Sequence, residues 1–208
     1  MTNPDQETYV FKSRKYWKLT DDAVAPGYPR YISSDWPGLA DNLDASFTWT
    51  NGKTYFFKGS KYWRFSNMTP DQGYPKPISH GFQGIPNNVD TAFVWSGNDK
   101  IYFFKGANYW RFDPEHSPPV KGSYPRPIIN WDGLPDNLSS AMQYKNGFTY
   151  FFKGNKYWRF NDRQFSVSFV NKSYPLNPLF EYRGVGGYKS VGDGQFQPRE
   201  TNRIFNGG

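Results

Sequence analysis

The sequence predicts an all-β fold, a four-bladed β-propeller whose four-stranded antiparallel blades surround a central tunnel. The first observation is a repeat: TYFFKGSKYWRF at residues 54–65 returns as IYFFKGANYWRF at 101–112 and as TYFFKGNKYWRF at 149–160. A diverged copy, YVFKSRKYWKL, occupies residues 9–19. Periods of this length are typical of solenoids, propellers and arrays. The equivalent tryptophans lie at intervals of 46, 47 and 48 residues, at Trp17, Trp63, Trp110 and Trp158.

The second observation is that the repeated segment has the pattern of strands and not of helices. Its aromatic runs, residues 55–57 and 62–65 in the second copy, are separated by a turn that contains Gly59. Glycine suits the tight reversal of a β-hairpin. Trp63 and Phe65 share one face of the later strand, while Tyr62 and Arg64 share the other, as the period of two of a pleated strand requires. Each unit is therefore expected to contain a strand, a tight turn and a strand.

Composition supports one aromatic-rich domain of many short strands. The chain has 208 residues, an aromatic content of 21% and a mean hydropathy of −0.83. A repeat that cannot bury its own face argues for one shared core, which must come from Phe, Tyr and Trp. The 20 glycines and 17 prolines punctuate the chain too often for long helices. No run of roughly 18 apolar residues is present, so we expect no membrane insertion.

Short segments with small residues precede three of the hairpins, and they predict the innermost strands. They read NLDASF at 42–47, NVDTAF at 88–93 and NLSSAM at 137–142. Small side chains let strands approach closely, as they must around a propeller axis. Before the first hairpin there are only the residues MTNPDQET, which lack this pattern. Blade one is therefore expected to lack its innermost strand.

Proline-rich segments follow each hairpin and predict the outer edge of each blade. They read PGYPRYIS at 26–33, QGYPKPIS at 72–79, GSYPRPII at 122–129 and KSYPLNPL at 172–179. Proline cannot donate a hydrogen bond into a ladder, so it suits an edge. Turns or a single helical turn then lead inward. This order gives blades at about 1–40, 41–86, 87–135 and 136–180. Residues 181–208 are rich in glycine and charge, and we interpret them as a flexible tail without a hairpin. The alternative, that part of this tail supplies the missing strand and closes the ring, stays open.

With these motifs in hand, residues 9 to about 180 closely resemble the hemopexin-like domain of the matrix-metalloproteinase type. The resemblance rests on the four hairpins, the inner-strand D-A-x-F pattern and the G-Y-P-K-P-I-S edges. It implies a non-catalytic extracellular recognition module, secreted or at the cell surface, whose partners are matrix protein, a protease inhibitor or a second copy of itself. Members of this family usually join blade one to blade four by a disulfide. This chain has no cysteine, so closure must come from packing or from altered ends.

The resemblance also implies calcium in the tunnel, with sodium or chloride beside it, held by main-chain carbonyls. Four strands converging on one axis would direct oxygen dipoles at a hard cation. Two departures weaken this expectation: Ser139 replaces the usual acid, and blade one has no matching strand. Alternatively, Asp44 and Asp90 only hydrogen-bond neighbouring inner-strand amides. The carried-over ligands are Asp44, Asp90 and Ser139 in one ring and Ser46, Ala92 and Ala141 in a second.

The sequence offers no catalytic constellation, so we do not expect an enzyme. His80 and His116 are the only histidines, and no HExxH motif is present, so no zinc is expected in this chain. The glycine-rich run at 184–194 fails as a phosphate loop because Tyr188 stands where glycine must precede Lys189. Asp21 and Asp22 have no nucleophile beside them. Both histidines are interpreted as solvated loop residues.

Positive charge is the remaining functional signal. The net charge is +7 and the pI is about 9.4, which favours anionic partners such as a sulfated polysaccharide. Arg64, Arg111 and Arg159 are flanked by core aromatics and are expected to pack within the fold. We expect no nucleic acid partner. Besides protein recognition, two functions stay open: a carrier of haem, polyamine or a small anion, and a heparin-like polyanion binder. The expected polyanion contacts are the hairpin lysines Lys58, Lys61, Lys105, Lys153 and Lys156.

Overall fold

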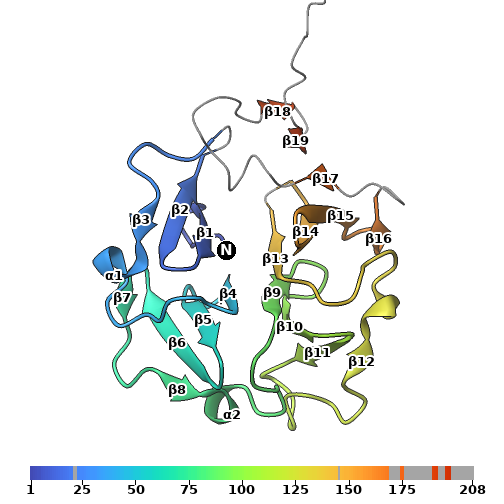
Figure 1. Ribbon diagram of the computed structural model, residues 1–208. Coiled ribbons are helices and arrows are strands. Elements are labelled where there is room, and N and C mark those ends of the chain that lie inside the picture. Colours follow the sequence, from blue (N-terminus) through green and yellow to red (C-terminus); the bar gives the residue numbers. More distant parts are fainter. Residues whose placement is uncertain (21–22, 145, 169–173, 176–188, 192–194, 198–208) are drawn as a thin grey trace, which may run out of the picture.

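The computed structural model describes residues 1–208 except 21–22, 145, 169–173, 176–188, 192–194 and 198–208 (Figure 1). Four antiparallel sheets follow one another around a central axis, which confirms the all-β four-bladed propeller (Figure 1). Blade three has the four strands expected of every blade. Blades two and four each carry one additional short strand, and blade one has three strands.

The strands run outward through each blade in chain order. Blade one contains β1 (Thr8–Lys12), β2 (Lys15–Leu19) and β3 (Arg30–Tyr31). Blade two contains β4 (Ala45–Thr48), β5 (Thr54–Lys58), β6 (Lys61–Ser66), β7 (Thr69–Pro70) and β8 (Lys76–Pro77). Blade three contains β9 (Thr91–Trp95), β10 (Lys100–Lys105), β11 (Asn108–Phe112) and β12 (Arg126–Pro127). Blade four contains β13 (Ser140–Gln143), β14 (Phe148–Lys153), β15 (Lys156–Asn161), β16 (Ser166–Val167) and β17 (Tyr174–Pro175).

The predicted order within a blade is confirmed. The four repeated hairpins are β1–β2, β5–β6, β10–β11 and β14–β15. The small-residue segments form the inner strands β4, β9 and β13, and the proline segments form the edge strands β3, β8, β12 and β17. The inward path begins with one helical turn in three blades. These turns are α1 (Ile32–Asp35), α2 (Ile78–Gly81) and the 3-10 helix η1 (Ile128–Asn130).

The inner side of blade one is held by the first two residues. Thr2 forms a bridge with Thr8, and the Met1 nitrogen donates to the carbonyl of Tyr9 at 2.8 Å. The Tyr9 amide donates back to the Met1 carbonyl at 2.8 Å. Blade one thus has no named inner strand, as expected, but Met1 and Thr2 occupy the places that Phe47 and Thr48 occupy beside Tyr55 and Thr54 in blade two.

Aromatic residues fill three of the seams between neighbouring blades. After the edge strands β3, β8 and β12 the chain sends one large ring into the seam: Trp36, Phe82 and Trp131, each no more than 2% exposed. The Trp36 ring lies 5.1 Å from Phe56, and the Phe82 ring lies 5.1 Å from Phe57, measured between centroids. Such edge-to-face pairs add to the free energy of burial. We call these three residues the plugs of seams one, two and three.

Backbone contacts also tie each hairpin turn to the next blade. The carbonyls of Ser13, Gly59 and Gly106 accept hydrogen bonds of 2.8–2.9 Å from the amides of Asn42, Asn88 and Asn137. The donors stand just before the inner strands of the following blades. The first residue of all four turns has a positive φ, between 55° and 61°. The hairpin turns therefore lie at one end of the propeller, and we call it the hairpin end.

The tail is described only in part. β18 (Lys189–Val191) and β19 (Gln195–Gln197) pair antiparallel with each other, so the expectation of a tail without a hairpin is wrong for this stretch. The rest of 181–208 lies outside the described residues, as do Asp21 and Asp22 and the supposed phosphate loop at Tyr188.

Candidate functional site

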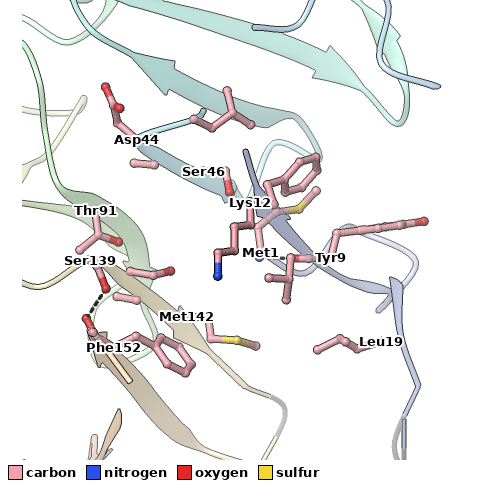
Figure 2. A pocket seen from close by; sticks show the side chains of 17 residues that line it. Met1, Tyr9, Lys12, Leu19, Asp44, Ser46, Thr91, Ser139, Met142 and Phe152 are labelled. Carbon is pink, nitrogen blue, oxygen red and sulfur yellow. Dashed lines mark hydrogen bonds between the residues drawn. The ribbon is translucent and has the colours of Figure 1, made fainter. Parts of the chain in front are cut away.

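The tunnel holds a cavity with a volume of about 330 Å³. Its wall comes from β1 and the end of β2, from the beginnings of the inner strands β4, β9 and β13, and from the end of β14 (Figure 2). A second cavity of about 100 Å³ shares Met1, Ser46, Ala141 and Met142 with the first. The empty space therefore continues along the axis.

The two aspartates predicted for the tunnel use their carboxylates to hold hairpin turns. Asp44 accepts a hydrogen bond of 2.7 Å from the amide of Gly59 and an ion-paired one of 2.7 Å from Nζ of Lys58. Asp90 accepts a hydrogen bond of 2.7 Å from the amide of Gly106. Both aspartates therefore hydrogen-bond backbone amides, as the alternative interpretation expected. The amides belong to the hairpin glycines, however, and not to inner strands.

Ser139 occupies the matching place in blade four. The amides of Asp44, Asp90 and Ser139 donate to the carbonyls of Phe57, Phe104 and Phe152 at 2.9, 2.8 and 2.7 Å. The hydroxyl of Ser139 also donates to the Phe152 carbonyl, at 3.0 Å, and the residue is exposed. In the predicted second ring, Ser46 and Ala141 line the cavity, whereas Ala92 is fully buried. Asp44 and Ser139 of the predicted first ring thus line the cavity together with Ser46 and Ala141, whereas Asp90 and Ala92 are not among its lining residues.

Lys12 is a cavity residue that we did not predict. Its side chain extends into the space between the inner strands, and its ammonium lies amid the lining residues (Figure 2). Lys12 stands at the place of Lys58 in the repeat. Lys58 bonds to Asp44 of its own inner strand, whereas blade one has Met1 and Thr2 beside β1. Lys12 is the last residue of β1 and is exposed.

Calcium in the tunnel stays a prediction, and the surrounding residues fit this ion poorly. Calcium prefers six to eight oxygen ligands, several of them carboxylates. Here Asp44 is already neutralised by Lys58, Ser139 has no carboxylate, and the Lys12 ammonium lies in the same cavity. Among the described residues, no group of three or more His, Cys, Asp or Glu side chains could hold a metal ion.

The hairpin lysines divide into tethered and exposed ones. Lys58 bonds to Asp44, and Lys105 donates to the carbonyl of Asn87 at 2.8 Å. Lys61 and Lys156, which follow the turn, are exposed, and Lys153 is partly exposed. Arg14 is an exposed cation of the blade-one turn that we did not predict. The positive charge that is open to a partner therefore comes mainly from the residues after the turn glycine.

The arginines beside the tryptophans belong to the fold. Arg64 donates to Asp71 at 2.5 Å, and its guanidinium lies 4.8 Å from the centroid of Tyr74. Arg159 is 8% exposed and stacks on Phe148 at 4.6 Å. Burial alone would raise the pKa of Asp71. Hydrogen bonds from Ser66 and Arg64 outweigh burial and hold this pKa below its ordinary value. The prediction of packing within the fold is confirmed for these two arginines.

The two histidines lie in segments outside the walls of the tunnel cavity. His80 is exposed in α2, and His116 is half exposed and within 2.9 Å of Asp113. Neither lines a cavity described above. Within the described ranges, no helix has the length and the apolar character needed to cross a membrane.

Comparison with known proteins decides the family. The sequence profile of the Hemopexin family matches residues 2–40, 43–87, 89–136 and 138–178. The chain belongs to the hemopexin family. Shorter matches join this hemopexin propeller to vitronectin from Oryctolagus cuniculus, 45% identical over 45 residues, and to stromelysin-1 from Equus caballus, 43% identical over 44 residues. They cover 22% and 20% of this chain, and only 10% and 9% of those relatives.

Solved structures share the fold of this hemopexin propeller. The hemopexin fold protein CP4 from cow pea superposes with a TM-score of 0.68 at 21% identity, over 89% of this chain and 96% of that one. A plant albumin from Cicer arietinum showing hemagglutination gives a TM-score of 0.69 at 21% identity, over 87% of this chain and 93% of that one. At this identity the likeness concerns the fold alone.

Proposed function

We propose that this hemopexin propeller is a non-catalytic, extracellular recognition module of the matrix-metalloproteinase type that binds an acidic face of a matrix protein. The observation that carries the proposal is the hairpin end, where Lys61, Lys156 and Arg14 stand exposed at or beside the hairpin turns. Similarity to vitronectin and stromelysin-1 supports a matrix setting. A protease inhibitor and a second copy of this chain are the other partners to be tested.

The geometry of the hairpin end suits recognition by charge. The turns of blades one, two and three are each fixed by a hydrogen bond to the following blade, so the cations beside them are held in place before a partner arrives. Asp44, which holds the turn of blade two, is already paired with Lys58 and adds little negative charge there. Exposed charges at the rim of an interface act mainly on the association rate and on the salt dependence of binding. We therefore expect salt-sensitive binding.

A panel of immobilised matrix proteins and protease inhibitors tests this proposal by surface plasmon resonance. The double variant Lys61→Glu/Lys156→Glu should bind its partner at least about tenfold more weakly, and mainly by slower association. Lys121→Glu, an exposed lysine of blade three, makes the matched control and should cost much less. Equal losses in the two variants would contradict a site at the hairpin end. Metal-dependent cleavage of gelatin or casein by the purified chain would contradict a non-catalytic module.

A heparin-like polyanion is the second candidate partner, because the exposed hairpin lysines repeat from blade to blade. Lys58 and Lys105 are tethered, so Lys61 and Lys156 would carry most of this binding, with help from Lys153. Elution from heparin resin well above physiological salt supports this candidate. Flow-through at low salt eliminates it, and leaves recognition of a protein unaffected.

A further inference from the structure

The hairpin turn of blade four lacks the acceptor that fixes the turns of blades two and three. In blade two the Gly59 amide donates to the Asp44 carboxylate at 2.7 Å, and blade three repeats this bond at the same length. Ser139 stands at the place of the aspartate in blade four, and its hydroxyl points to the Phe152 carbonyl instead (Figure 2). Within the described part of the chain, the amide of Gly154 therefore has no acceptor.

The backbone of blade four nevertheless keeps the place in which this carboxylate would lie. The amide of Ser139 donates to a carbonyl near the end of β14 at 2.7 Å, as the amide of Asp44 donates to one near the end of β5 at 2.9 Å. The φ of Gly154 is 59°, against 61° at Gly59. The inner strand and the turn therefore have the same relationship as in blade two, and only the carboxylate is missing.

The stretch that follows the edge strand of blade four lies outside the described residues, but its counterparts in other blades contact the other side of the turn. After blade two, the Asn88 amide donates to the Gly59 carbonyl, while the Gly59 amide stays bonded to Asp44 of its own blade. After blade three, the Asn137 amide donates to the Gly106 carbonyl in the same way. The two walls of the empty place, the turn and the residue before β13, are both described.

Lysines flank the empty place. Lys153 precedes Gly154 and lies opposite Lys156 across the turn. In blade two the equivalent of Lys153 is Lys58, whose ammonium lies 2.7 Å from the Asp44 carboxylate. Blade four has no carboxylate on its inner strand, and Gly154 and Lys156 are exposed. We call the place between Ser139, Lys153 and Gly154 the blade-four notch.

We propose that the blade-four notch binds the carboxylate of an aspartate or glutamate side chain of the partner protein. Blade two supplies the pattern, in which a turn amide and a lysine ammonium both donate to one carboxylate. Such charge-assisted hydrogen bonds are stronger than neutral ones, and a partner that covers the notch strengthens them further by excluding water. The proposal rests on the function proposed above, recognition of an acidic face by the hairpin end, and names one contact within it.

Nuclear magnetic resonance titration of the full chain tests the notch without any matrix protein. The probe is a blocked tripeptide with a central aspartate between two glycines, and the same peptide with a central asparagine is the neutral analogue. We expect the aspartate peptide to shift the amide resonance of Gly154 and to bind at least about tenfold more tightly than the asparagine peptide. The amides of Gly59 and Gly106 are internal controls, because Asp44 and Asp90 already accept from them.

Ser139→Asp gives blade four the carboxylate of the other blades. It should shift the Gly154 amide resonance by itself and remove the response to the aspartate peptide. Ser139→Ala, which removes the hydroxyl and adds no carboxylate, should bind the peptide like the wild type. Lys153→Met should weaken the peptide at least about threefold. Lys121→Met lowers the net charge by the same amount at an exposed site of blade three, and should leave peptide binding unchanged.

Surface plasmon resonance separates failure of the notch from failure of the proposed function. A matrix partner should bind Ser139→Asp at least about fivefold more weakly than Ser139→Ala. Equal binding of these two variants overturns the notch and leaves recognition by the hairpin end intact. A response of Gly154 to the aspartate peptide, with no matrix protein binding the chain, supports the notch and contradicts the proposed function.

The notch is also overturned if the two peptides bind equally, or if the amides of Gly59 and Gly106 shift as much as that of Gly154. Far-ultraviolet circular dichroism checks that each variant folds. If Ser139→Asp fails to fold, the comparison of the two peptides on the wild-type chain still decides.

Discussion

The carboxylate of Asp90 accepts a 2.7 Å hydrogen bond from the amide of Gly106, which lies 16 residues further along the chain. Asp44 and Gly59 repeat this relationship in blade two, also at 2.7 Å. In both blades, the residue that opens the inner strand therefore fixes the turn of the next hairpin. A family pattern that suggests a metal ligand here also has this second, purely structural use.

Asp90→Ala is expected to destabilise the fold by about 1–3 kcal/mol, because the Gly106 amide loses its acceptor in a partly buried turn. Urea unfolding followed by tryptophan fluorescence gives the free energy of unfolding. Ser139→Ala is the matched control: its exposed hydroxyl donates to a carbonyl that already accepts an amide, so its loss should cost about 0.5 kcal/mol or less. Equal costs for the two variants would contradict the role assigned to Asp90.

Ser13→Gly is expected to stabilise the protein by about 1 kcal/mol. Ser13 has a φ of 55° at the place where the other three turns have glycine, at 61°, 60° and 59°. Left-handed backbone conformations cost a residue with a Cβ atom roughly 1–2 kcal/mol. The reverse change, Gly59→Ser, should destabilise by a similar amount, although the Asp44 bond to its amide persists. A thermal unfolding midpoint that falls in Ser13→Gly would show that the turn does not carry strain.

The plugs are expected to dominate the stability of their seams. Trp131→Ala should cost about 3–5 kcal/mol, because it empties a site that is 1% exposed between blades three and four. Trp131→Phe should cost far less: seam two already uses Phe82, and the Trp131 Nε1 has no hydrogen-bond partner to lose. Ile129→Ala, at a site 78% exposed on the same segment, serves as control in urea unfolding. A large loss in Trp131→Phe would indicate a partner for the indole.

Asp162 is expected to give the fold an unusual pH dependence. Burial raises its pKa above the ordinary 3.8, although Ser96 and Thr149 donate hydrogen bonds to its Oδ2. A raised pKa in the folded state stabilises below the unfolded pKa, and this contribution is lost as pH rises through the folded pKa. The advantage of Asp162→Asn over the wild type should therefore grow as pH rises above the ordinary pKa of 3.8 and through the raised pKa of the folded state. Unfolding free energies measured across this range test it, and a difference that is constant with pH contradicts it.

Sequence periodicity predicted the fold well because the repeat supplies the same signals four times. The hairpins follow from alternating aromatics around glycine, and the edges follow from proline. The candidate site was predicted less well. The carboxylate role of Asp44 depends on Gly59, 15 residues away, and only the folded hairpin brings them together. The cavity could have been found by aligning the copies, since Val10 and Leu19 replace phenylalanines, but the direction of the Lys12 side chain required the structure.

Calcium is expected to leave the thermal unfolding midpoint nearly unchanged, because Asp44 is already paired with Lys58 and Ser139 has no carboxylate. A tight site saturated at one hundred times its dissociation constant would add about 2.7 kcal/mol, and so raise the midpoint by roughly 5–10 °C. We expect calcium to shift the midpoint by less than about 1 °C, with chelator having as little effect. Differential scanning calorimetry of one preparation measures both. A calcium shift of several degrees that chelator reverses would restore the carbonyl site at Asp44, Asp90 and Ser139.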